Sequence, residues 1–309
     1  MTFKIASFDG GGIRGVITLK LLEALEAKGN FQTHTHFDLF AGTSTGSILA
    51  VALAAGLSVS EMLKDYKTLS ADVFSHGKWL DLFQEKFSRK PLKETLLDVL
   101  APFGIDATTP LSALTKKVVI PTVRLDDPQT KRWSMVLLEN ITPAGKNHGI
   151  IDAILSSTAA PTYFSSYENC VDGGVAMNNP SLAAYSVAQI PLSLEKRGVQ
   201  LLSLGTGYVP KDYPGNEDWG PAEWLSLLSK DSSQGAVPLL SLLMDVSQQI
   251  PTQICSLLLP NAFRRINFPL SKAISLDDAS AIPTLIAKTE TFLDHHSDRI
   301  TATATWLTT

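Results

Sequence analysis

The chain has 309 residues, of which 44% are hydrophobic and 18% are charged. This composition excludes a disordered or fibrous protein, because apolar residues are plentiful and the glycines and prolines follow no period. The formal net charge of −4 argues against nucleic-acid binding, which needs a basic surface, and two cysteines are too few for a disulfide framework.

The N-terminal part of the chain alternates short apolar runs, which are typical of buried strands, with stretches of helical apolar spacing. These elements are a strand at Phe3–Phe8, a helix at Val16–Lys28, a strand at Phe37–Ala41 and a helix at Ser47–Ala55. Strands and helices that alternate so closely imply parallel strands joined by crossover helices.

The remainder of the chain repeats both patterns. We expect further strands at Val118–Val123, Trp133–Leu138, Glu168–Val171, Gln200–Leu204 and Phe263–Asn267. We expect further helices at Ser60–Leu69, Lys93–Leu100, Ile150–Ser157, Ser181–Gln189 and Pro283–His295. The stretch Val209–Gly220, rich in proline, glycine and acidic residues, predicts a surface loop. Since no repeat or linker is evident, we expect a single domain over residues 1–309.

A Gly-Thr-Ser-Thr-Gly motif at residues 42–46 lies between a predicted strand and a predicted helix. Its glycines, Gly42 and Gly46, permit a sharp turn that exposes the Ser44 hydroxyl at the N-terminus of the helix. There the helix dipole favours the negative charge that develops when a serine attacks a carbonyl. The pattern is also compatible with an ordinary turn, but the strand–turn–helix context favours a nucleophile.

A glycine-rich loop at residues 9–15 follows the first predicted strand. Its consecutive glycines, Gly10, Gly11 and Gly12, turn backbone N–H groups outward, which in an esterase forms an oxyanion hole. Together with Gly15, the loop also matches the G-x-G-x-x-G pattern of dinucleotide-binding folds. We give that alternative less weight, because such folds have an acidic residue at the end of the second strand. In this chain the second predicted strand ends at the turn that contains Ser44.

A third motif consists of Asp172, Gly173 and Gly174, which follow an apolar stretch. An aspartate at a strand end can lie at the sheet edge where catalytic residues gather, and a serine nucleophile needs a base. Asp172 is therefore a candidate proton acceptor. The alternative is an Asp-Gly turn without a catalytic role.

Histidine is the usual base, and His295 and His296 would complete the order serine, acid, histidine of α/β-hydrolases. That fold places its serine after several strands, whereas only one strand–helix unit precedes Ser44. The two histidines also lie in a polar setting typical of a solvated helix face. We therefore do not expect a histidine base. Since no metal-binding motif occurs, we expect neither a metal nor another cofactor.

The three motifs, in this order, resemble the patatin-like phospholipase family. The likeness continues through the segments Ser157–Tyr163, Leu202–Gly207, Arg265–Asn267 and Leu276–Ser280, and so covers nearly the whole chain. The resemblance implies an α/β fold with three α/β/α layers and a mostly parallel central sheet. The family often has Asp-Gly-Ala as its third motif, where this chain has Asp-Gly-Gly.

The resemblance also implies a Ser–Asp dyad without histidine. Ser44 would be the nucleophile and Asp172 the proton acceptor. The oxyanion hole would be formed by the loop residues Gly10, Gly11, Gly12 and Arg14, with Arg14 in a supporting role. The implied reaction is hydrolysis of acyl esters of membrane lipids, as by a phospholipase A or a lysophospholipase, without calcium. A storage or scaffold protein of the same fold is the non-enzymatic alternative.

Two apolar segments bear on contact with lipid. Residues 78–87 place aromatic side chains on one helical face, and residues 219–259 are rich in leucine. We expect both to pack in the core or to cover an acyl pocket, and docking on a lipid surface is the alternative. The sequence predicts neither the lipid headgroup, the acyl position nor the oligomeric state.

The N-terminus lacks the basic and apolar regions of a signal peptide. The longest purely apolar run, Ile48–Leu57, is much shorter than the ~20 residues that span a bilayer. We therefore expect a cytoplasmic protein whose contact with membranes is peripheral.

Overall fold

The computed structural model describes residues 2–64, 90–143, 145–161, 164–195, 198–210, 220–225, 238–271, 274–276 and 278–309. The apolar segment at 78–87 and most of the loop predicted at 209–220 lie outside these residues. Within them, seven strands form one sheet in the order β4-β3-β2-β1-β6-β7, and β5 also pairs with β3. The strands are β1 (Phe3–Phe8), β2 (Leu39–Gly42), β3 (Lys117–Arg124), β4 (Ser134–Glu139), β5 (Cys170–Asp172), β6 (Val199–Leu204) and β7 (Phe263–Ile266).

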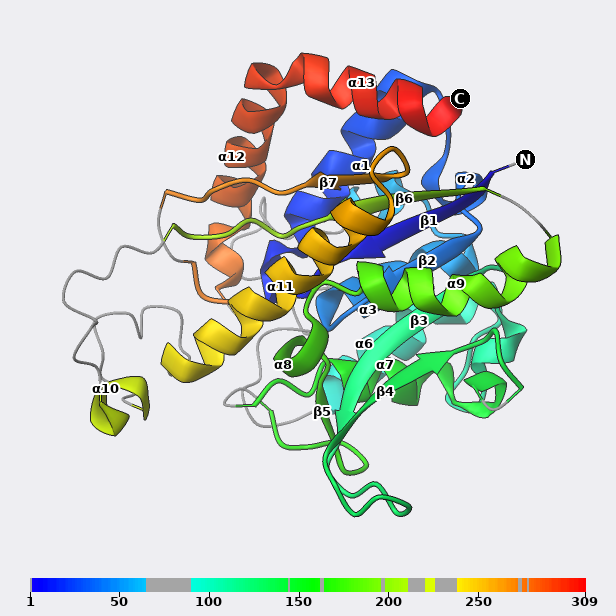
Figure 1. Cartoon of the computed structure of the whole chain (residues 1–309), viewed down its shortest axis with the longest axis vertical. Helices are drawn as coiled ribbons and strands as arrows, with labels where there is room; N and C mark the ends of the chain where they lie inside the picture. The colour runs from blue at the N-terminus through cyan, green and yellow to red at the C-terminus, as the bar shows by residue number, and fades with distance from the viewer. Residues whose placement is uncertain are drawn as a thin grey trace.

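The helices flank this sheet (Figure 1). They are α1 (Gly15–Gly29), α2 (Thr33–His36), α3 (Thr45–Ala55), α6 (Lys90–Leu100), α7 (Ile150–Ser157), α8 (Gly174–Met177), α9 (Ser181–Glu195), α10 (Pro221–Leu225), α11 (Pro238–Leu258), α12 (Ile282–His295) and α13 (Ser297–Thr308). Single 3-10 turns occur at Gly12–Arg14, Ala101–Phe103, Leu111–Ala113, Gly145–Asn147 and Ala279–Ala281.

The sheet is mostly parallel, as the alternation of strands and helices predicts. The strand β1 is parallel to β2 and β6, and the outer pairs β2–β3 and β6–β7 are parallel as well. Two strands are antiparallel, β4 and β5, and both pair with β3. The prediction of an α/β fold around a mostly parallel sheet is confirmed.

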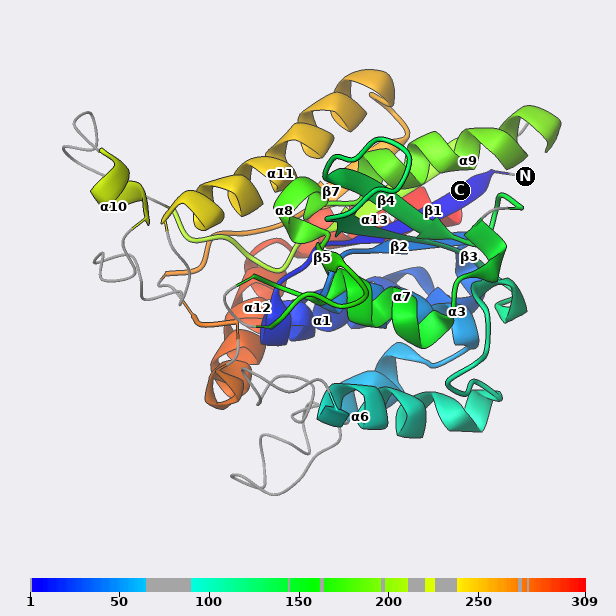
Figure 2. The same ribbon diagram turned by 90° about the horizontal axis from the view of Figure 1, so that it is seen from below.

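The helices lie on both faces of the sheet. Figure 2 shows α8, α9 and α11 on one face and α1, α3, α7 and α12 on the other. Side chains of the central strand alternate between the two layers, because successive residues of a strand point to opposite faces. Ile5 packs in the cluster that contains α9, while Phe8 packs in the larger cluster that contains α1 and α3.

Three of the longer helices differ most from the prediction. The helix expected at Ser181–Gln189 continues as α9 to Glu195, although it contains a proline at position 191, a residue that usually ends or kinks a helix. The long helix α11 contains Pro251, which is buried, and its leucine-rich sequence predicted no regular element. The threonine-rich helix α13 was not expected, because threonine favours strands and caps over helix interiors. Packing against α1 stabilises α13 in spite of this weak propensity.

The geometry of β3 sets up the site. The first part of β3, at Lys117–Val119, pairs with β2, and its last part, at Thr122–Arg124, pairs with the antiparallel strand β5. Since β4 occupies the other edge of β3, the strands β2 and β5 lie on the same edge and run toward each other. Their C-terminal ends therefore meet, which brings the chain after Gly42 close to Asp172.

No helix in the described part of the chain is long and apolar enough to cross a membrane.

Candidate active site

The turn between β2 and α3 holds Ser44 in a strained conformation. Its backbone has φ 52° and ψ −126°, a combination that residues other than glycine rarely adopt. The glycines on either side are required by space, because a Cβ on Gly42 would lie 1.9 Å from the carbonyl oxygen of Gly46, and one on Gly46 would lie 2.3 Å from that of Phe8. The Ser44 N–H donates to the Ser157 hydroxyl at 3.0 Å. Close packing thus forces Ser44 into the tight turn that its motif predicts.

Asp172 is the last residue of β5 and is only 2% exposed to solvent. The Ser44 side chain lies close enough to the carboxylate to favour its charged form, and Oδ1 accepts a hydrogen bond from the Gly174 N–H at 2.7 Å. Burial raises the pKa of the Asp172 carboxyl to about 6, although the Ser44 side chain and the Gly174 N–H both favour its charged form. The fold therefore brings together the two residues that the sequence singles out as nucleophile and base.

The glycines after Asp172 let the chain turn tightly against neighbouring strands. A Cβ on Gly173 would lie 2.2 Å from the Pro121 carbonyl oxygen in β3. One on Gly174 would lie 3.0 Å from Asp172 Oδ1 and from Asn178 Oδ1. An alanine in place of Gly174 would therefore crowd the carboxylate itself.

The glycine loop after β1 lies beside this pair. The Gly10 N–H donates to the Asn178 carbonyl oxygen at 3.1 Å. Among the described residues, the N–H groups of Gly11 and Gly12 have no acceptor from the protein. Gly12 has φ +56°, and a Cβ there would lie 2.2 Å from the Leu276 carbonyl oxygen. Of the three amides expected to bind an oxyanion, two are thus available and the Gly10 amide is already engaged.

Arg14 is buried at the end of the same loop. Its Nε donates to the Gly11 carbonyl oxygen at 3.4 Å, which links its side chain to the loop. Arg14 and Asp172 line the same cavity. Much of the remaining lining is apolar, chiefly Val175, Val209, Leu240, Met244 and Leu276, and it also includes the polar residues Ser241, Asp245 and Gln248. No described histidine lines this cavity, and His295 and His296 are exposed at the end of α12.

Residues 6–185, more than half of the chain, match the sequence profile of the patatin-like phospholipases. The chain belongs to this family. The matched residues contain the glycine loop, Ser44 and Asp172, whereas β6, α11 and β7 lie beyond them. Membership of the patatin-like phospholipases removes the support for the dinucleotide-binding interpretation of the glycine loop.

Several proteins are similar to this patatin-like phospholipase chain. Protein teg of Priestia megaterium is 30% identical over 305 residues, which cover 92% of this chain and 93% of that protein. A cGAMP-activated phospholipase of Escherichia coli is 30% identical over 233 residues, which cover 68% of this chain and 63% of that protein. Among solved structures, VipD from Legionella pneumophila has a TM-score of 0.44 and 14% identity, over 96% of this chain and 67% of that chain.

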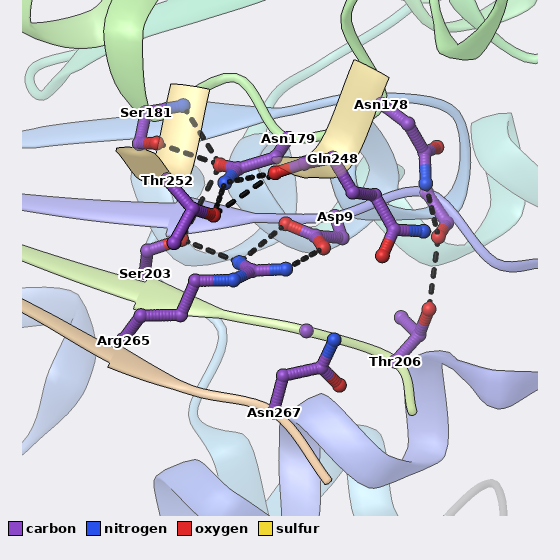
Figure 3. Close-up of polar contacts among 12 residues, drawn as sticks. Asp9, Asn178, Asn179, Ser181, Ser203, Thr206, Gln248, Thr252, Arg265 and Asn267 are labelled. Atoms are coloured by element: carbon purple, nitrogen blue, oxygen red, sulfur yellow. Dashed lines mark hydrogen bonds and ion pairs between the residues drawn. The ribbon is translucent and has the colours of Figure 1, made fainter. Parts of the chain in front are cut away.

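A buried ion pair behind the glycine loop was not anticipated. Arg265 in β7 contacts both carboxylate oxygens of Asp9, with an Nη1–Oδ1 distance of 3.0 Å, and also donates to the Ser203 hydroxyl at 2.7 Å. Figure 3 shows this contact at the centre of a polar network. The network continues from Ser203 to Asn179, whose Nδ2 donates to Thr252 of α11 at 3.0 Å. The Arg-Ile-Asn segment contributed to the family resemblance, but nothing in the local sequence pairs Arg265 with Asp9.

Proposed function

We propose that this patatin-like phospholipase hydrolyses acyl esters of membrane lipids, with Ser44 as the nucleophile and Asp172 as the proton acceptor. The observation that carries the proposal is the position of the Ser44 side chain beside the buried Asp172 carboxylate, whose charged form it favours. Nucleophile and base must be within hydrogen-bonding reach for direct proton transfer. Relatives named phospholipases support the lipid substrate class.

In the first half of the reaction, Ser44 Oγ forms a bond to the ester carbonyl carbon, and its proton passes to Asp172. The carbonyl oxygen becomes an oxyanion, which accepts hydrogen bonds from the N–H groups of Gly11 and Gly12. One such donor contributes roughly 3–4 kcal/mol to stabilisation of the transition state. The bond from carbon to the alcohol oxygen then breaks, and the alcohol leaves with the proton from Asp172.

In the second half, Asp172 takes a proton from water as the water oxygen attacks the acyl-enzyme. The bond between Ser44 Oγ and the acyl carbon breaks, the serine regains a proton from Asp172 and a fatty acid leaves. The raised pKa makes Asp172 a stronger base than an ordinary aspartate. Hydrolysis by the wild type should therefore decline as the pH falls below about 6, the pKa of this carboxyl.

The proposal is tested with a panel of phospholipids, lysophospholipids and acylglycerols, whose products are identified by mass spectrometry. We expect the wild type to release fatty acid in the presence of EDTA, since the described residues contain no cluster of three metal-ligating side chains. Ser44→Ala should abolish release, and Asp172→Asn should lower turnover by roughly 10²–10⁴. The His295→Ala/His296→Ala variant is the matched control and should retain activity.

A folded wild type that releases no fatty acid from any lipid of the panel would favour the storage or scaffold alternative. Labelling of Ser44 by a fluorophosphonate separates the two functions further, because a scaffold has no need for an activated serine.

Contact with a lipid surface is part of this proposal. Several exposed apolar side chains lie along one side of α11: Leu239, Leu242, Leu243, Val246 and Ile250. Their spacing of three and four residues places them on a common helix face. The neighbouring side of the same helix contributes Leu240 and Met244 to the cavity beside Asp172. An apolar surface that adjoins the catalytic cavity supports transient docking on a bilayer.

A further inference from the structure

The turn after β6 holds a threonine that the reaction steps above do not use. Thr206 is fully buried, and its hydroxyl donates to the Gly10 carbonyl oxygen at 2.9 Å. Asn178 Nδ2 approaches the same oxygen at 3.4 Å. Figure 3 shows both side chains directed at this one backbone oxygen from opposite sides. Two buried donors thus converge on the peptide that joins Gly10 to Gly11.

The direction of that carbonyl determines the direction of the next amide. The Gly10 C=O and the Gly11 N–H belong to one planar trans peptide, so they point in opposite directions. Donors that hold the Gly10 oxygen on one side therefore aim the Gly11 N–H to the other side. The Gly10 N–H is also fixed, by its hydrogen bond to the Asn178 carbonyl oxygen at 3.1 Å.

Neighbouring side chains pack closely against both glycines of this peptide. A Cβ on Gly11 would lie 2.3 Å from Thr206 Oγ1, and a Cβ on Gly10 would lie 2.3 Å from Asn178 Oδ1. The two glycines are thus the residues that permit Thr206 and Asn178 to approach the loop. Contact of this kind indicates that the loop and its two supports form one packed unit.

Both supports are anchored in other elements. The Gly207 N–H, next to Thr206, donates to Asn267 Oδ1 at 2.9 Å, immediately after β7. The Asn178 N–H donates to the Ser247 hydroxyl of α11 at 3.2 Å. Thr206 is therefore held in place by the sheet, and its hydroxyl can fix the position of the Gly10 carbonyl in the glycine loop.

We propose that Thr206, assisted by Asn178, is a positioning residue for the oxyanion hole. By holding the Gly10 carbonyl it aims the Gly11 N–H at the oxygen of the ester carbonyl. The inference rests on the proposed function, since it assigns a role within the same site. Neither side chain touches the reacting atoms, so the effect belongs to the transition state and not to substrate binding.

The test compares Thr206→Val, which keeps the shape but removes the donor, with Thr206→Ser, which keeps the donor. We expect Thr206→Val to lower kcat on a soluble short-chain p-nitrophenyl ester by at least ~10-fold with KM nearly unchanged. The reason is that the Gly11 N–H stabilises the oxyanion of the transition state, so that its displacement does not weaken substrate binding. Thr206→Ser should restore kcat to within a few-fold of wild type. Affinity for a trifluoromethyl ketone, which forms an oxyanion adduct with the serine, should fall in parallel with kcat.

The outcomes separate this inference from the proposed function. An active wild type whose kcat and ketone affinity are unchanged in Thr206→Val overturns the inference alone. Equal losses in Thr206→Val and Thr206→Ser also overturn it, because they indicate packing and not hydrogen bonding. A wild type that neither cleaves the ester nor binds the ketone overturns the proposed function and this role with it. If Thr206→Val does not fold, Thr206→Ala replaces it as the variant without a donor.

Discussion

At the scale of single residues, the backbone of Ser44 is the most informative feature of the site. Its positive φ, with ψ near −126°, places a side chain where glycine would be the unstrained choice. The turn keeps this strain because Gly42, Gly46 and the surrounding strands leave the chain no other path. The strained residue is also the one that the motif assigns to catalysis.

The strain predicts an unusual order of stability for two variants that both lack the hydroxyl. Ser44→Gly should be more stable than Ser44→Ala by about 1 kcal/mol, even though glycine gains more chain entropy on unfolding. Urea unfolding followed by circular dichroism measures the difference, and both variants should be inactive. An alanine variant that is at least as stable as the glycine variant would mean that the turn is relaxed.

The raised pKa of Asp172 makes a second prediction, about stability and pH. A carboxyl with a pKa of about 6 in the folded state, against an ordinary ~3.9 in the unfolded chain, favours the protonated form on folding. The protonated Asp172 carboxyl contributes to stability fully below pH ~4, and this contribution is lost as the pH rises through 6. The charged carboxylate therefore destabilises the fold at pH 8.

Asp172→Asn should therefore be more stable than the wild type at pH 8, by up to roughly 3 kcal/mol. The difference should shrink as the pH is lowered to 5, because the wild-type carboxyl becomes neutral. Urea unfolding at both pH values measures this difference. A variant less stable than wild type at pH 8 would contradict the direction of the pKa shift.

At the scale of secondary-structure elements, the Asp9–Arg265 ion pair joins the end of β1 to β7. The strand β6 lies between them, and its Ser203 is the register partner of Arg265. The Asp9 side chain is completely buried and that of Arg265 is 11% exposed. A pair in this setting links the glycine loop to the sheet edge that is farthest from β4.

Removing one partner of this ion pair should lower the free energy of unfolding more than removing both. Arg265→Met leaves the Asp9 carboxylate buried without its partner, and we expect a loss of about 3–5 kcal/mol in the free energy of unfolding. The double variant Asp9→Asn/Arg265→Met should recover part of this loss, because no uncompensated charge remains. Urea denaturation of the single and double variants gives the coupling energy. If the effects of the two changes simply add, the pair makes no stabilising contact.

At the scale of the whole molecule, the exposed apolar side of α11 predicts contact with bilayers. Flotation with phosphatidylcholine vesicles measures binding, in a Ser44→Ala background that prevents hydrolysis. Leu243→Ser/Ile250→Ser should lower the bound fraction by roughly ten-fold, since each change removes apolar area from the contact. A net charge of −4 predicts no gain from anionic lipid.

The control for vesicle binding is Met135→Ser, because Met135 is exposed to a similar extent, 44%, in β4, away from α11. It should bind vesicles like the parent protein. Equal loss in both variants would show that binding is not localised to α11. A parent protein that dimerises in solution through Leu243 and Ile250, and does not bind vesicles, would assign this side of the helix to a second copy of the chain.

The sequence by itself determined the features that depend on neighbouring residues. The alternation of short apolar runs and helical spacing predicts β1 and α7 with the bounds that the structure has. The glycine motifs predict the turns at Ser44 and Asp172, because glycine is the residue that permits such close backbone approach. The family resemblance rested on the same local patterns, and the profile match confirms it.

Only the tertiary structure decided which of these turns meet and what supports them. The meeting of Ser44 and Asp172 depends on β5 pairing antiparallel with β3, in line with β2. The contacts of Arg265 with Asp9 and of Thr206 with Gly10 likewise join segments that are remote in sequence. Contacts of this kind leave no periodic or local pattern, because they arise from the pairing order of the strands and from burial. The sequence therefore specified the chemical groups, and strand pairing brought them together.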